Sequence, residues 1–334
     1  MTREGFTKAG HKIGSKEIET VLSRINKELK SYKRFELGVI NPIYFIKTND
    51  KSEYVLRLTN PFWSGHKTEN EVTVINFLRK NTTIPLPVIV DYDFSDSRIG
   101  YEYIFMEKVP GKPLGKVWEK LSKKDKKIIL KQIAGIFAQL KKFSFSKIGS
   151  FKKGMKLGPL MDPHEGPFEN FKDYMAACIN YRIPEIRKNK RFKKYAPQIG
   201  EFVEKVVKKY DKKIKYYLTH GDIFINNVMV KENKITALLD FEWCHSAPLD
   251  EEFENFERHP KLNKELEKYF MNLLRKKGMD IAEGYEERKV LYAVNRISME
   301  LVCYKHWFLN KPKTGEKFIK NECKKLENIL KKYI

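Results

Sequence analysis

Several sequence features that define whole classes of protein are scarce or missing in this chain of 334 residues. It has four cysteines, which are widely separated and form no CxxC pair: Cys178, Cys244, Cys303 and Cys323. We therefore expect reduced thiols, with neither a disulfide framework nor a zinc site. No apolar run approaches the ~18 residues of a membrane span, and the charged N-terminus has no signal-peptide pattern. These absences indicate a cytoplasmic protein with no membrane partner.

Two glycine-rich nucleotide-binding motifs are missing as well. The chain contains neither the GxxxxGK[ST] pattern of a P-loop nor the GxGxxG pattern of protein kinases. Its hydrophobic content of 41% with 13% aromatic residues is nevertheless enough for a sizeable core. We therefore expect a folded protein, and any nucleotide must be bound without either of these loops.

Acidic residues are few relative to basic ones. The chain has 66 Lys and Arg against 43 Asp and Glu, which gives a net charge of +23. Such an excess can indicate a nucleic-acid partner. The lysines are, however, spread along the chain and mostly fall on the polar faces of predicted helices, which is typical of a solvated surface. We expect no nucleic-acid partner; a functional polyanion footprint is the alternative, and a nucleotide triphosphate could use part of this field.

The densest group of candidate functional residues lies in residues 218–250. His-Gly-Asp at 220–222 is followed by Asn227, five residues after the aspartate, and then by Asp240. Two short apolar runs separated by Lys-Glu-Asn-Lys occupy residues 228–239, which predicts a β-hairpin. Pairing of its strands brings Asn227 and Asp240 to the same end.

Phosphoryl transfer from a nucleotide requires three groups of this kind in one place. A carboxylate must lie near the attacking hydroxyl, and oxygen ligands must hold Mg²⁺ against the phosphates. We assign the first role to Asp222 and the metal to Asn227 and Asp240. Each of these residue types alone is more often a turn residue, but the combination at this spacing favours the functional interpretation.

At these residues the chain resembles the aminoglycoside phosphotransferase and choline kinase superfamily, whose signature is His-Gly-Asp-x4-Asn followed by a metal-binding Asp. Protein kinases carry His-Arg-Asp-x4-Asn and Asp-Phe-Gly at the corresponding places. Gly221 here replaces the Arg, and Glu242 replaces the Gly after Asp-Phe. Both differences favour a small-molecule kinase over a protein kinase. The resemblance implies an α+β, bilobal protein kinase-like fold, with a small antiparallel-sheet N-lobe carrying one helix and a larger, mostly helical C-lobe.

Hydrophobic periodicity gives the same order of elements. Apolar residues at helical spacing from Ile18 to Leu29 predict an amphipathic helix over 16–31. Strands are predicted at 35–46, 53–58, 85–91 and 101–108, with a helix at 67–80. Ser122 is a predicted N-cap. Further helices are predicted at 123–143, 168–182, 194–210, 261–277, 284–309 and 314–332.

The resemblance also assigns nucleotide-binding residues in the small lobe. The family often has a short Gly/Ser/Asn phosphate loop where Gly38 and Asn41 stand, although Gly38 alone suits an ordinary turn. Arg57 lies on a strand, and Glu71 on the following helix is its natural partner. This matches the family pair of strand cation and helix Glu that positions the α- and β-phosphates. Most kinases use Lys here, so Arg is a difference that could affect the rate.

The resemblance further implies that residues 104–111 form the hinge between the lobes. Adenine is expected to be recognised there by main-chain groups of Glu107 and Val109. The lobe boundary is placed where Pro110 and Gly111 end the sheet pattern. We therefore expect an N-lobe over 1–107 that binds the nucleotide. The C-lobe, 108–334, would hold the catalytic loop, the metal site and the acceptor pocket.

The acceptor pocket is the least defined part of the prediction. The turn-rich segment 158–168 resembles a family insertion over the substrate, and the acidic cluster 250–257 could attract a cationic substrate. We interpret the cluster as the charged first turn of a helix, and the resemblance implies a structural role for Asp250. Four residues that could reach the pocket are interpreted as core: Tyr292, Arg296, His306 and Trp307.

The sequence therefore predicts a kinase that transfers the γ-phosphoryl group of Mg-ATP, or GTP, to a hydroxyl of a small metabolite or antibiotic. Two alternatives stay open. One is a protein kinase-like enzyme, against which the missing Asp-Phe-Gly and Ala-Pro-Glu elements argue. The other is a non-catalytic module that binds nucleotide or another polyanion, which Arg57 and the net charge leave open.

Overall fold

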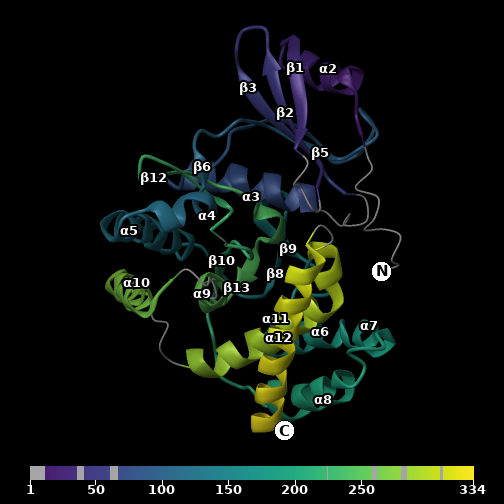
Figure 1. Ribbon diagram of the computed structural model, residues 1–334, viewed down its shortest axis with the longest axis vertical. Coiled ribbons are helices and arrows are strands. Elements are labelled where there is room, and N and C mark those ends of the chain that lie inside the picture. The colour runs from purple at the N-terminus through teal and green to yellow at the C-terminus, as the bar shows by residue number, and fades with distance from the viewer. Residues whose placement is uncertain are drawn as a thin grey trace.

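Among the described residues, the N-terminal part of the computed structural model contains a five-stranded antiparallel sheet and two helices (Figure 1). The structure describes residues 12–35, 41–60, 67–223, 225–257, 262–279, 284–308 and 311–334. The helices are α2 (Ser15–Ser23) and α3 (Lys67–Asn81). The strands, in the spatial order β1-β2-β3-β5-β4, are β1 (Leu29–Phe35), β2 (Ile43–Thr48), β3 (Glu53–Leu58), β4 (Ile89–Asp93) and β5 (Tyr103–Glu107).

Side chains along β2 and β3 point alternately to the two faces of this sheet, and the two faces have different neighbours. Tyr44 and Leu56 pair across the strands and are buried on the face covered by α2. Phe45 and Val55 pair on the opposite face, because successive side chains of a strand point to opposite sides. Arg57 is two residues beyond Val55 and therefore shares that second face, toward α3 and the rest of the molecule.

The helix predicted over 16–31 is wrong in its second half. The helix ends at Ser23, and the chain turns through Asn26, whose φ of 53° is left-handed and incompatible with continuation of the helix. Leu29 then opens β1, which pairs with β2. The strand predicted over 35–46 is accordingly the end of β1 and the start of β2, and β4 begins only at Ile89, after two prolines that cannot donate to a ladder.

The remainder of the chain is mostly helical, as predicted. Ser122 caps the first long helix by accepting a hydrogen bond from the backbone N–H of Asp125, as expected. The helices are α4 (Leu114–Val117), α5 (Lys123–Leu140), α6 (Phe171–Asn180), α7 (Ile183–Lys188), α8 (Tyr195–Phe202), α9 (Asp250–Glu257), α10 (Lys264–Lys276), α11 (Tyr285–Trp307) and α12 (Pro312–Tyr333).

Two small sheets accompany these helices. The predicted hairpin forms from β11 (Val228–Lys231) and β12 (Lys234–Leu238), with β6 (Lys112–Pro113) beside β11. A second five-stranded sheet was not predicted, because its strands of two to four residues are too short to show a period. Its order is β7 (Ser144–Phe145), β10 (Tyr216–Thr219), β13 (His245–Ala247), β8 (Gly149–Lys152) and β9 (Lys156–Gly158).

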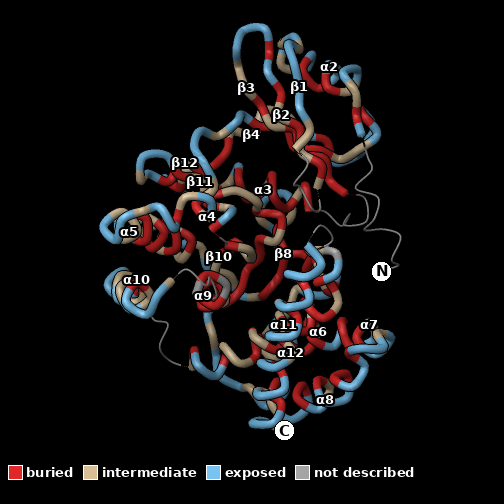
Figure 2. Tube along the Cα trace, in the orientation of Figure 1, coloured by how far each residue is buried: buried red, intermediate tan, exposed pale blue. Residues whose placement is uncertain are grey.

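The helical part is built on two buried apolar clusters, which Figure 2 shows as red segments on the inner faces of the helices. One cluster joins α3, α5, the hairpin, α9 and α10, with Phe137 packed edge-on against Phe253. The other joins α6, α7, α8, α11 and α12. The first cluster supports β10, β11 and β12, so the residues at the ends of these strands stand on a rigid base. Among the described residues, no helix is long and apolar enough to cross a membrane.

Candidate active site

The predicted catalytic loop begins where β10 ends, at His220-Gly221-Asp222. Gly221 has φ +80°, and a Cβ at this position would overlap the carbonyl oxygen of Trp243. Both the left-handed backbone and the close approach require glycine. The loop can therefore not carry the arginine that protein kinases have at this point.

His220 holds the loop from the inside. Its ring is buried, with Nε2 2.9 Å from the carbonyl oxygen of Leu239 and Nδ1 accepting the backbone N–H of Asp222 at 3.2 Å. Burial lowers the pKa of His220 to about 4, so the imidazole is neutral at physiological pH. The ring thus fixes the backbone of Asp222 and links it to the end of β12.

A second support comes from Glu252 on α9. Its buried carboxylate accepts a hydrogen bond from the backbone N–H of Gly221, and burial raises its pKa to about 7. Its neighbours on the helix are also turned inward: Asp250 is paired with Arg288, and Glu251 accepts from the hydroxyl of Tyr174 at 2.8 Å. The first three residues of the acidic cluster, Asp250, Glu251 and Glu252, are therefore engaged with the protein interior at the start of α9.

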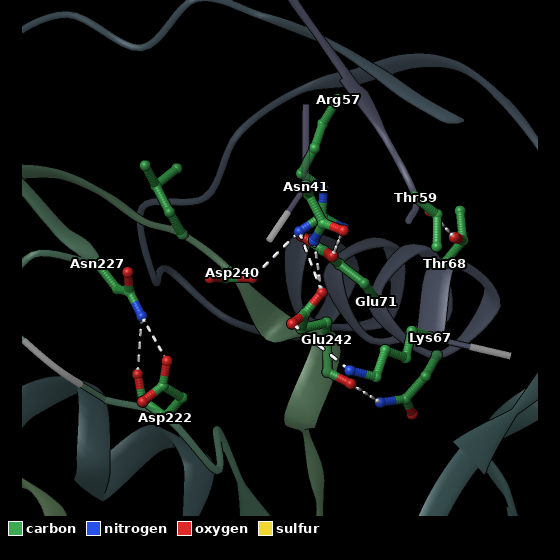
Figure 3. Close-up of polar contacts among 12 residues, drawn as sticks. Asn41, Arg57, Thr59, Lys67, Thr68, Glu71, Asp222, Asn227, Asp240 and Glu242 are labelled. Atoms are coloured by element: carbon green, nitrogen blue, oxygen red, sulfur yellow. Dashed lines mark hydrogen bonds and ion pairs between the residues drawn. The ribbon is translucent and has the colours of Figure 1, made fainter. Parts of the chain in front are cut away.

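Asp222 and Asn227 are in direct contact. The side-chain amide of Asn227 donates to the backbone oxygen of Asp222 at 3.0 Å and to its Oδ2 at 3.1 Å. Figure 3 shows the oxygen of Asn227 on the side away from Asp222. Burial, helped by repulsion from Asp240, raises the pKa of Asp222 to about 8. The carboxyl of the ligand-free protein is therefore mostly protonated at neutral pH.

The hairpin brings Asp240 to the same end as Asn227, as predicted. Val228 pairs with Leu238, and the backbone N–H of Leu239 donates to the carbonyl oxygen of Asn227 at 2.8 Å. Asp240 follows in a left-handed conformation, φ 70° and ψ 61°, which Asp tolerates better than most residues. Burial and the neighbouring Glu242 raise its pKa to about 6.

Arg57 connects these residues to the small sheet. It forms a buried ion pair with Glu71, the predicted partner on α3, and its Nη1 lies 3.1 Å from Oδ1 of Asp240 (Figure 3). These carboxylates raise the pKa of Arg57 above its ordinary value, so it remains charged. The side chain of Asp240 is 37% exposed, against 9% for Arg57 and 3% for Glu71. Asp240 is therefore the most accessible of these three side chains.

Comparison with known proteins identifies the family. Residues 31–255 match the model of the phosphotransferase enzyme family that includes the aminoglycoside phosphotransferases. The chain belongs to this family. The match covers β1 through most of α9, and so it includes every predicted site residue.

Solved structures of phosphotransferases share the fold over nearly the whole chain. APH(2″)-IIa, solved with gentamicin, is 14% identical with a TM-score of 0.65, and the alignment covers 95% of this chain and 96% of that one. A thermostable mutant of aminoglycoside phosphotransferase APH(4)-Ia, in complex with AMP-PNP and hygromycin B, has 14% identity and a TM-score of 0.64 over 94% and 98%. Macrolide 2′-phosphotransferase MphH from Brachybacterium faecium has 12% identity and a TM-score of 0.59 over 91% and 97%. The predicted bilobal kinase-like fold is confirmed.

A curated relative is a subtelomeric hrmA-associated cluster protein of Aspergillus fumigatus. It is 30% identical over 116 residues, which are 34% of this phosphotransferase. The match spans about a quarter of the length of that relative, 23%.

Glu242 is a site residue that the sequence reasoning did not assign. Its carboxylate accepts a hydrogen bond from the side-chain amide of Asn41 at 2.9 Å, and it lies 3.7 Å from Arg57 Nη1 and 3.8 Å from Lys67 Nζ. Lys67 also lies 3.7 Å above the ring of Trp243. Glu242 thus joins the β1–β2 connection, β3 and the start of α3 to the end of the hairpin. The sequence signal that could have identified Glu242 was the presence of a second carboxylate two residues after Asp240.

The other predicted nucleotide residues have different outcomes. Gly38 lies outside the described residues. Asn41 is in the site through its contact with Glu242. At the hinge, the backbone N–H of Glu107 donates to Val88 and that of Lys108 to Glu53, both at 2.9 Å. The adenine contact through Glu107 and Val109 stays a prediction, with the Val109 amide as its expected donor.

The segment 158–168 packs on the helical part. Asp162 is paired with Arg182 at 2.9 Å, next to α6 and α7. Tyr292 donates to Asp250 at 2.7 Å, and Arg296 is paired with Glu300, so both belong to the interior networks of α11, as interpreted. The side chain of His306 lies outside the described residues.

Proposed function

We propose that this protein is a small-molecule kinase that transfers the γ-phosphoryl group of Mg-ATP, or GTP, to a hydroxyl of a small metabolite or antibiotic. One observation carries the proposal: Asp222, Asn227, Asp240 and Arg57 come from three separate stretches of sequence and form one connected group. Phosphoryl transfer relies on positioning and on charge stabilisation, which require such convergence.

In this proposal, Asp222 orients the acceptor hydroxyl and accepts its proton. Burial and Asp240 raise its pKa to about 8, and a cation bound beside Asp240 would lower this pKa into the range in which a proton acceptor works near the ambient pH. The hydrogen bonds from Asn227 hold the carboxylate in one orientation. His220 and Glu252 keep the loop backbone in place, so Asp222 meets the hydroxyl without reorganising.

The donor set suits Mg²⁺. The free side of the Asn227 amide presents an oxygen, and Asp240 presents an accessible carboxylate, which are the hard oxygen ligands that this ion prefers. Bound Mg²⁺ would neutralise charge on the phosphates during transfer. Glu242, next to Asp240, adds negative charge that favours a cation at this point.

Arg57 supplies the positive charge for the phosphates. Glu71 fixes its position, and the guanidinium, whose Nη1 lies 3.1 Å from Oδ1 of Asp240, would contact a phosphate oxygen bound beside that carboxylate. Gly38 and Asn41 would approach the phosphates from the β1–β2 connection, and the hinge residues Glu107 and Val109 would hold the base. Solved relatives with gentamicin and with AMP-PNP and hygromycin B support a nucleotide donor and a hydroxyl-bearing acceptor.

The test is an ADP-release assay with Mg-ATP and with Mg-GTP against a panel of sugars, amino alcohols, aminoglycosides, macrolides and hydroxy amino acids. The Asp222→Asn variant should lose on the order of 10²–10⁴ in rate with the best acceptor. Asp96→Asn is the matched control, because Asp96 lies in an exposed turn with φ 55°, which Asn adopts readily. Unchanged turnover in Asp222→Asn would refute the role of Asp222. Nucleotide binding without ADP release from the parent protein would favour the non-catalytic alternative.

A further inference from the structure

The positive charge of this protein is concentrated by the fold. Residues 183–215 contain 12 Lys and Arg but 4 Asp and Glu, and residues 311–334 contain 8 Lys against 3 Glu. These two segments therefore carry 13 of the 23 net positive charges. They are far apart in sequence but adjacent in space, because α12 packs beside α8 and the residues that precede it, at the end of the molecule away from the N-terminal sheet (Figure 1).

Five lysines form a stripe along α12. They lie at spacings of 4, 3, 4 and 7 residues, which places them within about 60° of arc on a helix of 3.6 residues per turn. All five are exposed, and Figure 2 shows the outer side of α12 as exposed. The opposite side of the helix, with Ile319, Leu326 and Leu330, is buried in the core. We call this set the α12 lysine stripe: Lys313, Lys317, Lys320, Lys324 and Lys331.

Acidic residues next to the stripe already have partners. Glu316 is paired with Arg191 at 2.6 Å, and Glu327 with Lys194 at 3.0 Å, both from the segment between α7 and α8. These ion pairs fasten that basic segment against α12 and offset the negative charge nearest to the stripe. The ion pairs thus place this basic segment directly beside α12.

We propose that the α12 lysine stripe binds a double-stranded nucleic acid through its phosphates. From Lys313 to Lys331 the stripe extends about 27 Å, at 1.5 Å per residue. A duplex carries one negative charge per ~1.7 Å of axis, so about eight base pairs face this length with a regular array of phosphates. Contacts to phosphates alone recognise no base sequence.

The surface fits this partner better than a membrane or a single strand. A helix that binds a bilayer inserts an apolar face, but the apolar face of α12 is already used in the core. Proteins that bind single strands stack bases on aromatic side chains. Among the described residues of α12, Tyr333 at its end is the large hydrophobic side chain that is exposed. Charge alone is therefore the available means of binding.

The experiment measures fluorescence anisotropy of labelled RNA and DNA duplexes of about 20 base pairs, between about 50 and 200 mM salt. Five phosphate contacts give a slope of log K against log salt of about −4.5 and about a 500-fold loss of affinity over this range. The variant Lys317→Glu/Lys320→Glu/Lys324→Glu should reduce the magnitude of the slope by about 2.7. It should also lower affinity at least tenfold for every duplex sequence.

The matched control reverses the charge of three exposed lysines on another surface helix, α10: Lys264, Lys268 and Lys276. Figure 1 shows α10 on the opposite side of the helical part from α8. This control should bind duplexes within about threefold of the parent. Three results would overturn the proposal. The two variants could lose duplex affinity equally, the stripe variant could bind duplexes as tightly as the parent, or the parent could bind phosphatidylserine vesicles more tightly than duplexes. ADP release by the stripe variant should equal that of the parent, so this test is independent of the proposed kinase function.

Discussion

Replacing Asp222 by Asn should make the ligand-free protein more stable at neutral and alkaline pH, although we expect the same change to slow catalysis. Asp222 is half-buried, and its desolvation together with repulsion from Asp240, Glu242 and Glu252 raises its pKa to about 8. Asn227 offsets part of this by donating to Oδ2. An Asn side chain has nearly the same shape and can accept the same hydrogen bond, but it has no charge to bury.

The sign and size of the effect follow from the two pKa values. An unfolded Asp ionises at about 3.9, so the folded state binds more protons than the unfolded state between pH ~4 and ~8. The contribution of Asp222 to the free energy of unfolding is therefore fully present below pH ~4 and is lost as the pH rises through about 8. One pKa unit corresponds to about 1.4 kcal/mol, which makes the loss between pH 5 and pH 8 on the order of 4 kcal/mol. For a chain of this length, that corresponds to about 6 °C in Tm.

Thermal unfolding of parent, Asp222→Asn and the control Asp96→Asn at several pH values between 5 and 8 measures this directly. The parent and the control should lose Tm in parallel as the pH rises. Asp222→Asn should lose less, so that its advantage grows with pH and is largest at pH 8. An advantage that is the same at every pH would show that Asp222 does not titrate in this window, and the pKa of about 8 would be wrong.

Two further predictions concern Asp240 and Gly221. Asp240→Asn keeps the left-handed backbone but removes the charge, so calorimetry should show Mg-ATP binding weakened at least tenfold, and equal affinity would exclude Asp240 as a ligand. Gly221→Ala should cost more stability in urea than Gly100→Ala, because both glycines have positive φ but the new Cβ at 221 would overlap Trp243. At 100 nothing lies within 4 Å, so strain alone costs about 1 kcal/mol there; equal losses would refute the overlap.

How much of the fold could be predicted depended on the length of each element. The long helices α5, α11 and α12 repeat their apolar positions over several turns, and their existence was predicted correctly. The strands β7 and β8 are too short to repeat any pattern, and they form only because β10 and β13 supply pairing partners. The first helix was predicted too long, because Leu29 fits the helical spacing of apolar residues although it lies on strand β1 and packs on the core from there.

The candidate site was predicted where chemistry restricts the residue type. Asp222, Asn227 and Asp240 are joined as expected, and Arg57 meets Glu71. Two functional contacts that were missed involve side chains whose partners come from distant segments. Glu242 contacts Asn41, which lies 201 positions earlier in the chain, and Glu252 contacts Gly221 from a helix that looked like an ordinary acidic first turn. Sequence spacing cannot reveal such contacts, because they are created by the packing of the two lobes and of α9.

The ligand-free site is electrostatically unbalanced, and this imbalance is the strongest physical argument for a cationic ligand. Asp222, Asp240 and Glu242 come together beside Arg57, which Glu71 already engages. Like charges in a buried place raise one another's pKa and lower the stability of the empty protein. In a chain of net charge +23, packing alone gives no reason to gather carboxylates. A divalent cation between Asn227 and Asp240 would remove the repulsion, so its binding should lower the pKa of Asp222 and put the carboxylate in the form that accepts a proton.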